Sequence, residues 1–176
     1  NVYVTADNKG LISGLAGAAP TADTVSSAVG AVSTAFASKA TIAAASLKAN
    51  DTIRIKAAGI VSASVGGINC QLTMKIGSAV VGAQTAALNV VANDYFLLEA
   101  DVVFAAVGAV GSYNSTMRSV IGHSGAGTEK NAYVSTKATA LDTTSARDIT
   151  VLVDLGAGAG VTVDLYVLDV QVFHKA

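Results

Sequence analysis

The stretch that most constrains this chain covers residues 50–64. After an Asn-Asp turn signal, Ile53 and Ile55 alternate with Arg54 and Lys56. This period of two is typical of a β-strand that places one face on a core and the other in water. An Ala-Ala-Gly step follows, and a glycine within a strand marks a bulge or a close backbone approach.

The same pattern recurs along most of the chain, with Gly, Asn and Asp turns between the segments. We expect about 8–10 strands without helical interruption, which predicts an all-β antiparallel sandwich or barrel. The expected strands cover residues 36–42, 52–64, 69–76, 79–81, 86–91, 95–104, 115–122, 132–141, 149–155 and 161–173.

The Ala-rich segment 21–37 admits two interpretations. Val25, Val29 and Phe36 fit helical spacing, and Asp23 could cap such a helix. Gly30 and the Val, Thr and Ser content favour extended structure. We prefer a short strand followed by a second strand at 36–42.

The last predicted strand changes phase. A glycine turn at 156–160 joins it to the preceding strand as a hairpin. Its apolar residues keep one phase up to Val167 and take the other from Leu168. A slip of one residue within a strand predicts a β-bulge.

The chain divides into an N-terminal arm, residues 1–22, and a domain, residues 23–176. Glycines and a proline forbid a long regular element in the arm. Val2, Tyr3 and Val4 could add a short strand to a neighbour, so we expect them to contact another subunit or protein.

The chain is poor in charge. Charged residues make up 13% and hydrophobic residues 52%, where about 25% charged is usual. We expect part of the apolar surface to be buried against copies of the chain or a partner. The alternative is a tightly packed monomer that is simply poor in charge.

The net charge of −1 and the scattered Lys and Arg residues favour neither nucleic acid nor an anionic membrane as partner. The N-terminus lacks the basic and apolar regions of a signal peptide, so synthesis in the cytosol is expected. Residues 76–93 are uncharged, but polar residues and glycines interrupt them, which argues against a membrane span.

The single cysteine, Cys70, excludes an intramolecular disulfide framework. It shares one strand face with Leu72, Met74 and Ile76. We expect a buried core thiol, because free cysteine is among the most buried residue types.

Two glycine-rich loops resemble phosphate-binding motifs at first sight. In residues 122–130, Lys130 follows too late after Gly127 for a Walker A loop, and a strand is expected next. Residues 156–160 have GxGxG spacing rather than GxGxxG. Neither loop predicts nucleotide binding.

No catalytic or metal-binding constellation is evident in the sequence. His123 and His174 lie far apart without a second plausible ligand beside either. Glu99 and Asp101, two apart on one strand face, could bind Ca²⁺ or form a glycosidase pair, although a solvated or interface face is expected. We expect no enzyme activity, no cofactor and no metal.

Four segments together resemble a known family. They are AASLKANDTIRIKAAG (44–59), LTMKIG (72–77), NDYFLLEA (93–100) and DITVLV (148–153), the last followed by the glycine hairpin. In this order they resemble the single jelly-roll modules that tailed bacteriophages carry as virion structural proteins. The resemblance covers about residues 33–173 and implies a jelly-roll sandwich without catalytic residues.

The resemblance does not imply one role, but among that family's roles we favour a capsid cement or decoration protein, because the chain is one compact domain with a short arm and without the coiled-coil heptads or repeats of a fibre shaft. That role implies a location on the outer surface of the head after synthesis in the host cytoplasm, with the major capsid protein and further copies, as a homotrimer, as partners. Residues 122–130 would face solvent or an adjacent subunit.

Two other functions are weighed. A head-fibre or tail-appendage module that binds a host receptor or surface glycan would need exposed aromatic side chains, for which Tyr113 and Tyr133 are the candidates. An enzyme, such as a depolymerase fragment, is the least favoured because the acidic residues are dispersed.

Overall fold

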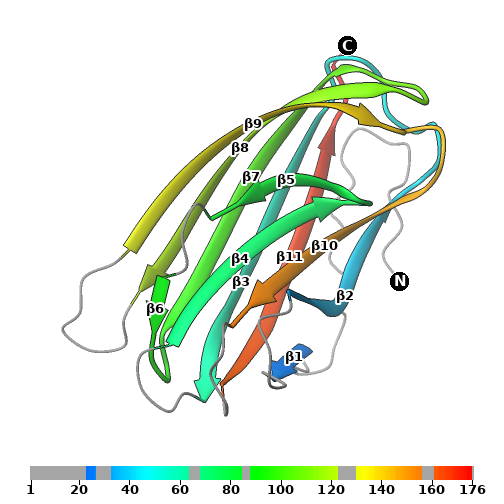
Figure 1. Cartoon of the computed structure of the whole chain (residues 1–176). Helices are drawn as coiled ribbons and strands as arrows, with labels where there is room; N and C mark the ends of the chain where they lie inside the picture. The colour runs from blue at the N-terminus through cyan, green and yellow to red at the C-terminus, as the bar shows by residue number, and fades with distance from the viewer. Residues whose placement is uncertain are drawn as a thin grey trace.

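The computed structural model describes residues 23–26, 33–63, 68–84, 88–122, 130–155 and 161–175. Within these ranges every regular element is a β-strand, and each pairing of neighbouring strands is antiparallel. The strands form two layers, with the larger sheet curving around the smaller one (Figure 1). The predicted all-β sandwich is therefore confirmed, while the jelly-roll assignment stays a prediction.

The strands belong to two sheets. The larger sheet consists, in spatial order, of β1 (Asp23–Ser26), β11 (Thr162–Phe173), β3 (Thr52–Ala63), β7 (Tyr95–Ala106), β8 (Gly111–Gly122) and β9 (Lys130–Leu141). The smaller sheet runs β2 (Thr34–Ile42), β10 (Arg147–Asp154), β4 (Ile68–Ile76) and β5 (Ala79–Ala83), and β6 (Leu88–Val90) also pairs with β4.

The described ranges thus hold 11 strands. The sequence predicts about 8–10, so the structure has one strand more than the upper end of that range. The short strand expected near the start of the domain is confirmed at Asp23–Ser26. The largest boundary difference is at β8, which begins at Gly111 rather than at residue 115.

Alternation in β3 and β7 places the core as the sequence predicts. Ile53 and Ile55 are fully buried between the sheets, while Arg54 and Lys56 are exposed on the outer face. The inward residues of β7, from Phe96 to Phe104, are likewise buried. Burying each large apolar side chain contributes about 1.5–3 kcal/mol, so this interior is the main source of stability.

The predicted bulge in β11 is confirmed one residue earlier, because the register with β3 shifts between Leu165 and Val167. The backbone comes very close to β3 there. A Cβ added at Gly59 would overlap the carbonyl oxygen of Asp164 and lie 2.6 Å from the ring of Phe96. The expected close approach at this glycine is therefore present.

Gln84 is a polar side chain that joins the two layers inside the core. Gln84, 1% exposed, follows β5, and its Oε1 accepts a hydrogen bond from the Leu72 N–H of β4 at 2.8 Å. Its Nε2 donates to Ser119 Oγ of β8 at 3.0 Å. A buried amide is tolerated because donor and acceptor atoms are both paired.

Cys70 lies on β4 and is 1% exposed, as predicted for a core thiol. Burial, followed by the nearby charge of Asp154, raises its pKa to about 12. The thiolate needed for redox or nucleophilic chemistry is therefore strongly disfavoured.

Candidate functional site

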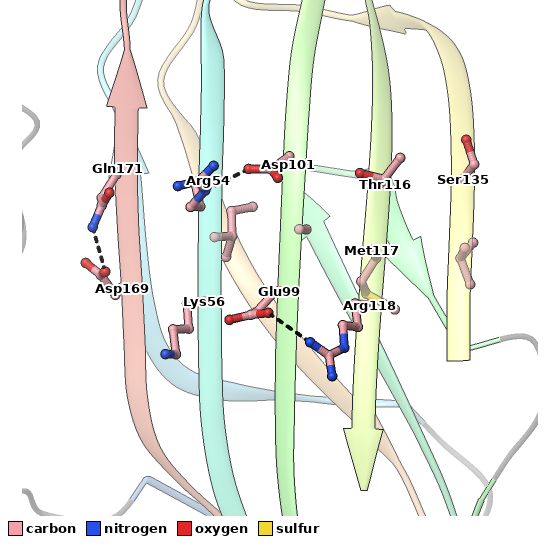
Figure 2. A pocket seen from close by; sticks show the side chains of 13 residues that line it. Arg54, Lys56, Glu99, Asp101, Thr116, Met117, Arg118, Ser135, Asp169 and Gln171 are labelled. Atoms are coloured by element: carbon pink, nitrogen blue, oxygen red, sulfur yellow. Dashed lines mark hydrogen bonds and ion pairs between the residues drawn. The ribbon is translucent and has the colours of Figure 1, made fainter. Parts of the chain in front are cut away.

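A groove with a volume of about 780 Å³ crosses the outer face of the larger sheet. Two rows of side chains from neighbouring strands line it (Figure 2). By register, one row runs Gln171, Arg54, Asp101, Thr116 and Ser135, and the next runs Asp169, Lys56, Glu99 and Arg118.

The charges of the groove are balanced within each row. Arg54 Nε lies 2.9 Å from Asp101 Oδ1, and Arg118 Nη1 lies 4.0 Å from Glu99 Oε2. These are half-exposed cross-strand pairs, which stabilise a sheet by about 0.2–1 kcal/mol each. The groove therefore presents both hydrogen-bond donors and acceptors and carries no net charge.

Glu99 and Asp101, the two carboxylates considered for Ca²⁺ binding or a glycosidase pair, both belong to this groove. The carboxylates share the outer face, as the spacing predicts, but each one faces an arginine on a neighbouring strand. Among the described residues, no group of three or more His, Cys, Asp or Glu side chains could hold a metal ion. The pair lies on a solvated polar face.

A second surface lies at the end of the sandwich where three connections meet, near the C-terminus in Figure 1. The Ala45 N–H donates to the Thr143 carbonyl at 3.0 Å. The Gly108 N–H donates to Thr143 Oγ1 at 2.7 Å, and the Thr143 N–H donates to the Gly108 carbonyl at 2.9 Å. Thr143 thus ties the β2–β3 and β7–β8 connections together.

We call this surface the apolar loop end, because small apolar side chains on the tied connections point into solvent. Val110 is 73% exposed, the highest fraction among the large exposed hydrophobic residues that the structure describes. The exposed members are Ala43, Ala44, Ala45, Ala49, Ala105, Ala106, Val107, Ala109 and Val110. Clustered exposed apolar residues mark sites of protein–protein contact.

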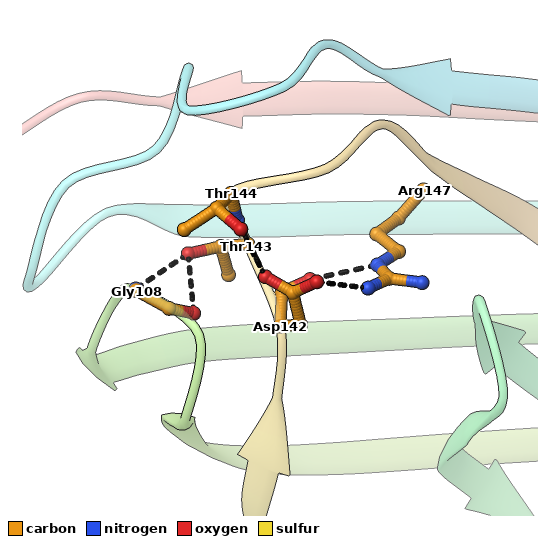
Figure 3. A network of polar contacts seen from close by, with 5 residues as sticks. All are labelled: Gly108, Asp142, Thr143, Thr144 and Arg147. Atoms are coloured by element: carbon orange, nitrogen blue, oxygen red, sulfur yellow. Dashed lines mark hydrogen bonds and ion pairs between the residues drawn. The ribbon is translucent and has the colours of Figure 1, made fainter.

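A charged network supports this end from the β9–β10 connection (Figure 3). Asp142 Oδ1 accepts hydrogen bonds from the Thr144 hydroxyl and amide at 2.6 and 2.9 Å, and Arg147 Nη2 lies 2.5 Å from Asp142 Oδ2. The Thr144 hydrogen bonds, followed by Arg147, lower the pKa of Asp142 to about 2. The connection is held in one shape by these contacts.

His174 has a structural partner. Its Nδ1 lies 2.7 Å from Oδ2 of Asp51, a fully buried carboxylate. The same carboxylate accepts the N–H of Lys48 at 2.8 Å and that of Lys175 at 3.2 Å. Asp51 thus fixes the residues after β11 to the β2–β3 connection.

The interpretation of Tyr113 as an exposed aromatic candidate is wrong. Its side chain is 1% exposed, and its hydroxyl donates to the Val80 carbonyl at 2.7 Å. Burial also raises the pKa of the phenol. Tyr113 faces inward because β8 begins before it and points residues 113, 115, 117 and 119 into the core.

Several residues singled out in the sequence lie outside the described part of the chain. They are Val2, Tyr3, Val4, His123 and the glycine turn 156–160, together with most of the loop 122–130. The side chain of Tyr133 is also outside it. The predictions for these residues remain predictions.

Sequence reasoning did not find the groove or the apolar loop end, because both depend on long-range strand register.

None of the described segments forms a helix of the length and hydropathy needed to cross a bilayer. No protein-family model matches this chain, and no curated protein sequence matches it either.

Proposed function

We propose that this protein is a capsid cement or decoration protein of a tailed bacteriophage, which binds the outer surface of the mature head. Its partners are the major capsid protein and further copies of itself, with a homotrimer as the form that the sequence resemblance implies. The observation that carries the proposal is the apolar loop end, an exposed apolar surface already fixed in shape by hydrogen bonds.

Preorganisation is what makes this surface suited to the role. Binding is weakened when loops must be ordered at the interface. Here the hydrogen bonds of Thr143 and the Asp142–Arg147 pair hold the connections before any partner arrives. Burial of small Ala and Val side chains then contributes to affinity without a large ordering cost.

The mechanism of stabilisation is mass action. A protein that binds the expanded shell and not its precursor or its ruptured form shifts the equilibrium toward the filled shell. We assign a further contact to the arm, residues 1–22, through Val2, Tyr3 and Val4. An extended apolar segment of this kind can add to an exposed sheet edge of a neighbour.

The direct test is co-sedimentation with expanded capsids that lack the protein. Saturable binding with a fixed copy number per capsomer is expected. Val110→Lys should weaken binding at least tenfold, because it places a charge in the apolar contact. Val91→Lys is the matched control, since Val91 is 39% exposed beside β6, outside the apolar loop end.

Deletion of residues 1–22 tests the arm separately. The shortened protein should stay folded and lose capsid binding. Full binding by the deletion variant would show that the arm is not a contact. Equal binding by wild type, Val110→Lys and Val91→Lys would refute the role of the apolar loop end, and no binding at all would refute the cement function.

The groove favours a second candidate, a head-fibre or tail-appendage module that binds a host receptor or surface glycan. Its balanced rows of Arg, Lys, Asp, Glu and Gln offer donors and acceptors to a neutral polyhydroxyl ligand. Glycan screening tests this function, with Arg54→Ala plus Asp101→Ala expected to abolish any binding found. An unchanged signal in that double variant would exclude the groove.

A further inference from the structure

β9 is an outer strand of the larger sheet and offers a long free edge. It pairs with β8 on one side, and no described strand pairs with its other side. In Figure 1 it forms the outer margin of the curved sheet. Edges of this kind are templates for pairing with another chain.

The other described edges are shorter or covered. β1 has 4 residues and β5 has 5. β2 has a register irregularity against β10, and the N–H of its Ser38 donates to the carboxylate of Asp23 in β1. By contrast, β9 has 12 residues, and its register with β8 is regular from residue 130 to residue 139.

The direction of the backbone groups on β9 follows from one contact. Ser115 Oγ of β8 lies 3.4 Å from the Thr136 carbonyl oxygen, so this carbonyl points toward β8. Backbone groups alternate in direction along an antiparallel strand. The N–H and C=O of Ser135 and Lys137 therefore point away from the sheet, as do those of every second residue from 131 to 139.

Two of the devices by which proteins protect an edge, a proline and a bulge, are missing from this stretch. Residues 130–139 contain no proline, and the regular register shows no bulge within them. Lys137 is exposed, but its side chain projects from the outer face along with Ser135 and does not block the edge. Among the described residues, the edge is therefore open to a second strand.

We propose that β9 pairs antiparallel with β9 of a second copy of this chain, about a two-fold axis at Ser135. Residues whose backbone groups point outward must face each other, and an axis at 135 lets the regular residues 131–139 overlap fully. Lys137 then lies opposite residue 133 and Lys130 opposite residue 140, so no lysine faces a lysine. β9 contains no acidic residue, so no other charge interferes.

This pairing joins the larger sheets of two chains into one continuous sheet. A two-fold contact lies outside a homotrimer, so it links chains of two different trimers where that form exists. An isologous contact of this kind is the commonest form of self-association. It uses the β9 edge, whereas the proposed capsid contacts use the apolar loop end and the arm. Its failure would therefore leave the cement proposal untouched.

Cross-linking tests the register directly. In the proposed dimer the two Ser135 residues form a hydrogen-bonded pair with Cα atoms about 5.5 Å apart, which suits a disulfide. Ser135→Cys should give a disulfide-linked dimer under mild oxidation. Asn114→Cys is the matched control, because Asn114 is exposed on β8 one strand further in, and the buried Cys70 should not react.

Loss of the pairing can be measured by sedimentation equilibrium. Proline at 135 removes an outward N–H and leaves the bonds to β8 in place, so Ser135→Pro should halve the mass of the species that wild type forms. Ser135→Ala keeps the N–H and should keep the wild-type mass. A monomeric wild type, an unchanged mass in a folded Ser135→Pro, or equal cross-linking at residues 114 and 135 would each overturn the proposal.

Discussion

At Gly59, the absence of a side chain decides whether β3 can pair closely with β11. A Cβ there would overlap the Asp164 carbonyl and press on the Phe96 ring. Backbone atoms cannot give way as a flexible side chain can. The constraint therefore acts on the pairing of two central strands of the larger sheet.

Gly59→Ala should lower the free energy of unfolding by about 1–3 kcal/mol, the usual cost of overpacking. Urea unfolding measures it as a lower midpoint with an unchanged slope. Lys56→Ala, on the exposed face of the same strand, should change stability by less than about 0.5 kcal/mol. Equal stability of Gly59→Ala and wild type would mean that the strands can move apart freely.

Asp142 gives the β9–β10 connection a dependence on pH. Its pKa is lowered from 3.8 to about 2 by Thr144 first and then by Arg147. A carboxyl group with a lowered pKa stabilises the folded state above its unfolded pKa, and this contribution is lost as pH falls through the folded value. The stabilisation is thus complete above about pH 4 and disappears toward pH 2.

Thr144→Val should raise the pKa of Asp142 toward 3.8, because it removes the hydroxyl donor. NMR titration of the Asp142 carboxyl carbon measures this shift. Asp142→Asn should be less stable than wild type at pH 5 and equally stable near pH 2. A difference between the two proteins that stays constant from pH 5 to pH 2 would contradict the assignment.

At the scale of elements, the C-terminal end of β11 depends on a single buried carboxylate. Asp51 accepts hydrogen bonds from the backbone of Lys48 and Lys175 and contacts His174. Its oxygens are shielded from water, so the lost hydrogen bonds could not be replaced by solvent without rearrangement.

Asp51→Ala should destabilise the fold by about 1–3 kcal/mol through the unpaired backbone donors. Amide hydrogen exchange should accelerate at Lys48 and Lys175, while the amides in the middle of β3 and β7 stay protected. Asp169→Ala removes a carboxylate on the groove side of β11 and serves as the control. In this variant the amides of Lys48 and Lys175 should keep their slow exchange. Unchanged exchange in Asp51→Ala would show that the strand end is held by other contacts.

How far the sequence predicts this fold differs between strands. β3 and β7 alternate cleanly between apolar and other residues, so their buried faces follow from the sequence. In β8 the inward positions include Ser115 and Ser119, which are buried because they bond to Val81 and Gln84. These polar inward residues hide the alternation, and for that reason Tyr113 was wrongly placed outside the core.

The candidate surfaces were predictable to a smaller degree. Spacing predicts that Glu99 and Asp101 share a face. Their arginine partners, however, lie far away in the sequence, with Arg54 47 positions before Asp101 and Arg118 on the strand after Glu99. Likewise, Asp51 and His174 are separated by 123 positions. Such pairings depend on strand order and register, which local patterns do not contain.

At the scale of the whole molecule, Cys70 reports on the integrity of both layers. The thiol is buried in the core between the two sheets, and its pKa of about 12 keeps it protonated. It should therefore stay unreactive toward a thiol reagent at pH 8 until the sheets separate. Labelling in increasing urea should follow the unfolding curve measured by circular dichroism.

Ser135→Cys provides the control for this measurement, because residue 135 is exposed. Its added thiol should react within the dead time when the protein is kept reduced. Fast labelling of Cys70 in native wild type would mean that the layers open locally around β4, without global unfolding.

Gln84 also has a mechanical consequence for the sandwich. It binds Leu72 in one sheet and Ser119 in the other, deep between apolar side chains. Leu72 lies in the same layer as Gln84 and would move with it, but if one layer slid along the other by a residue, Nε2 of this amide would lose Ser119 in a region that water does not reach. The two layers therefore resist sliding past each other. Under a pulling force, we expect the domain to unfold in one abrupt step and not by gradual sliding of the sheets.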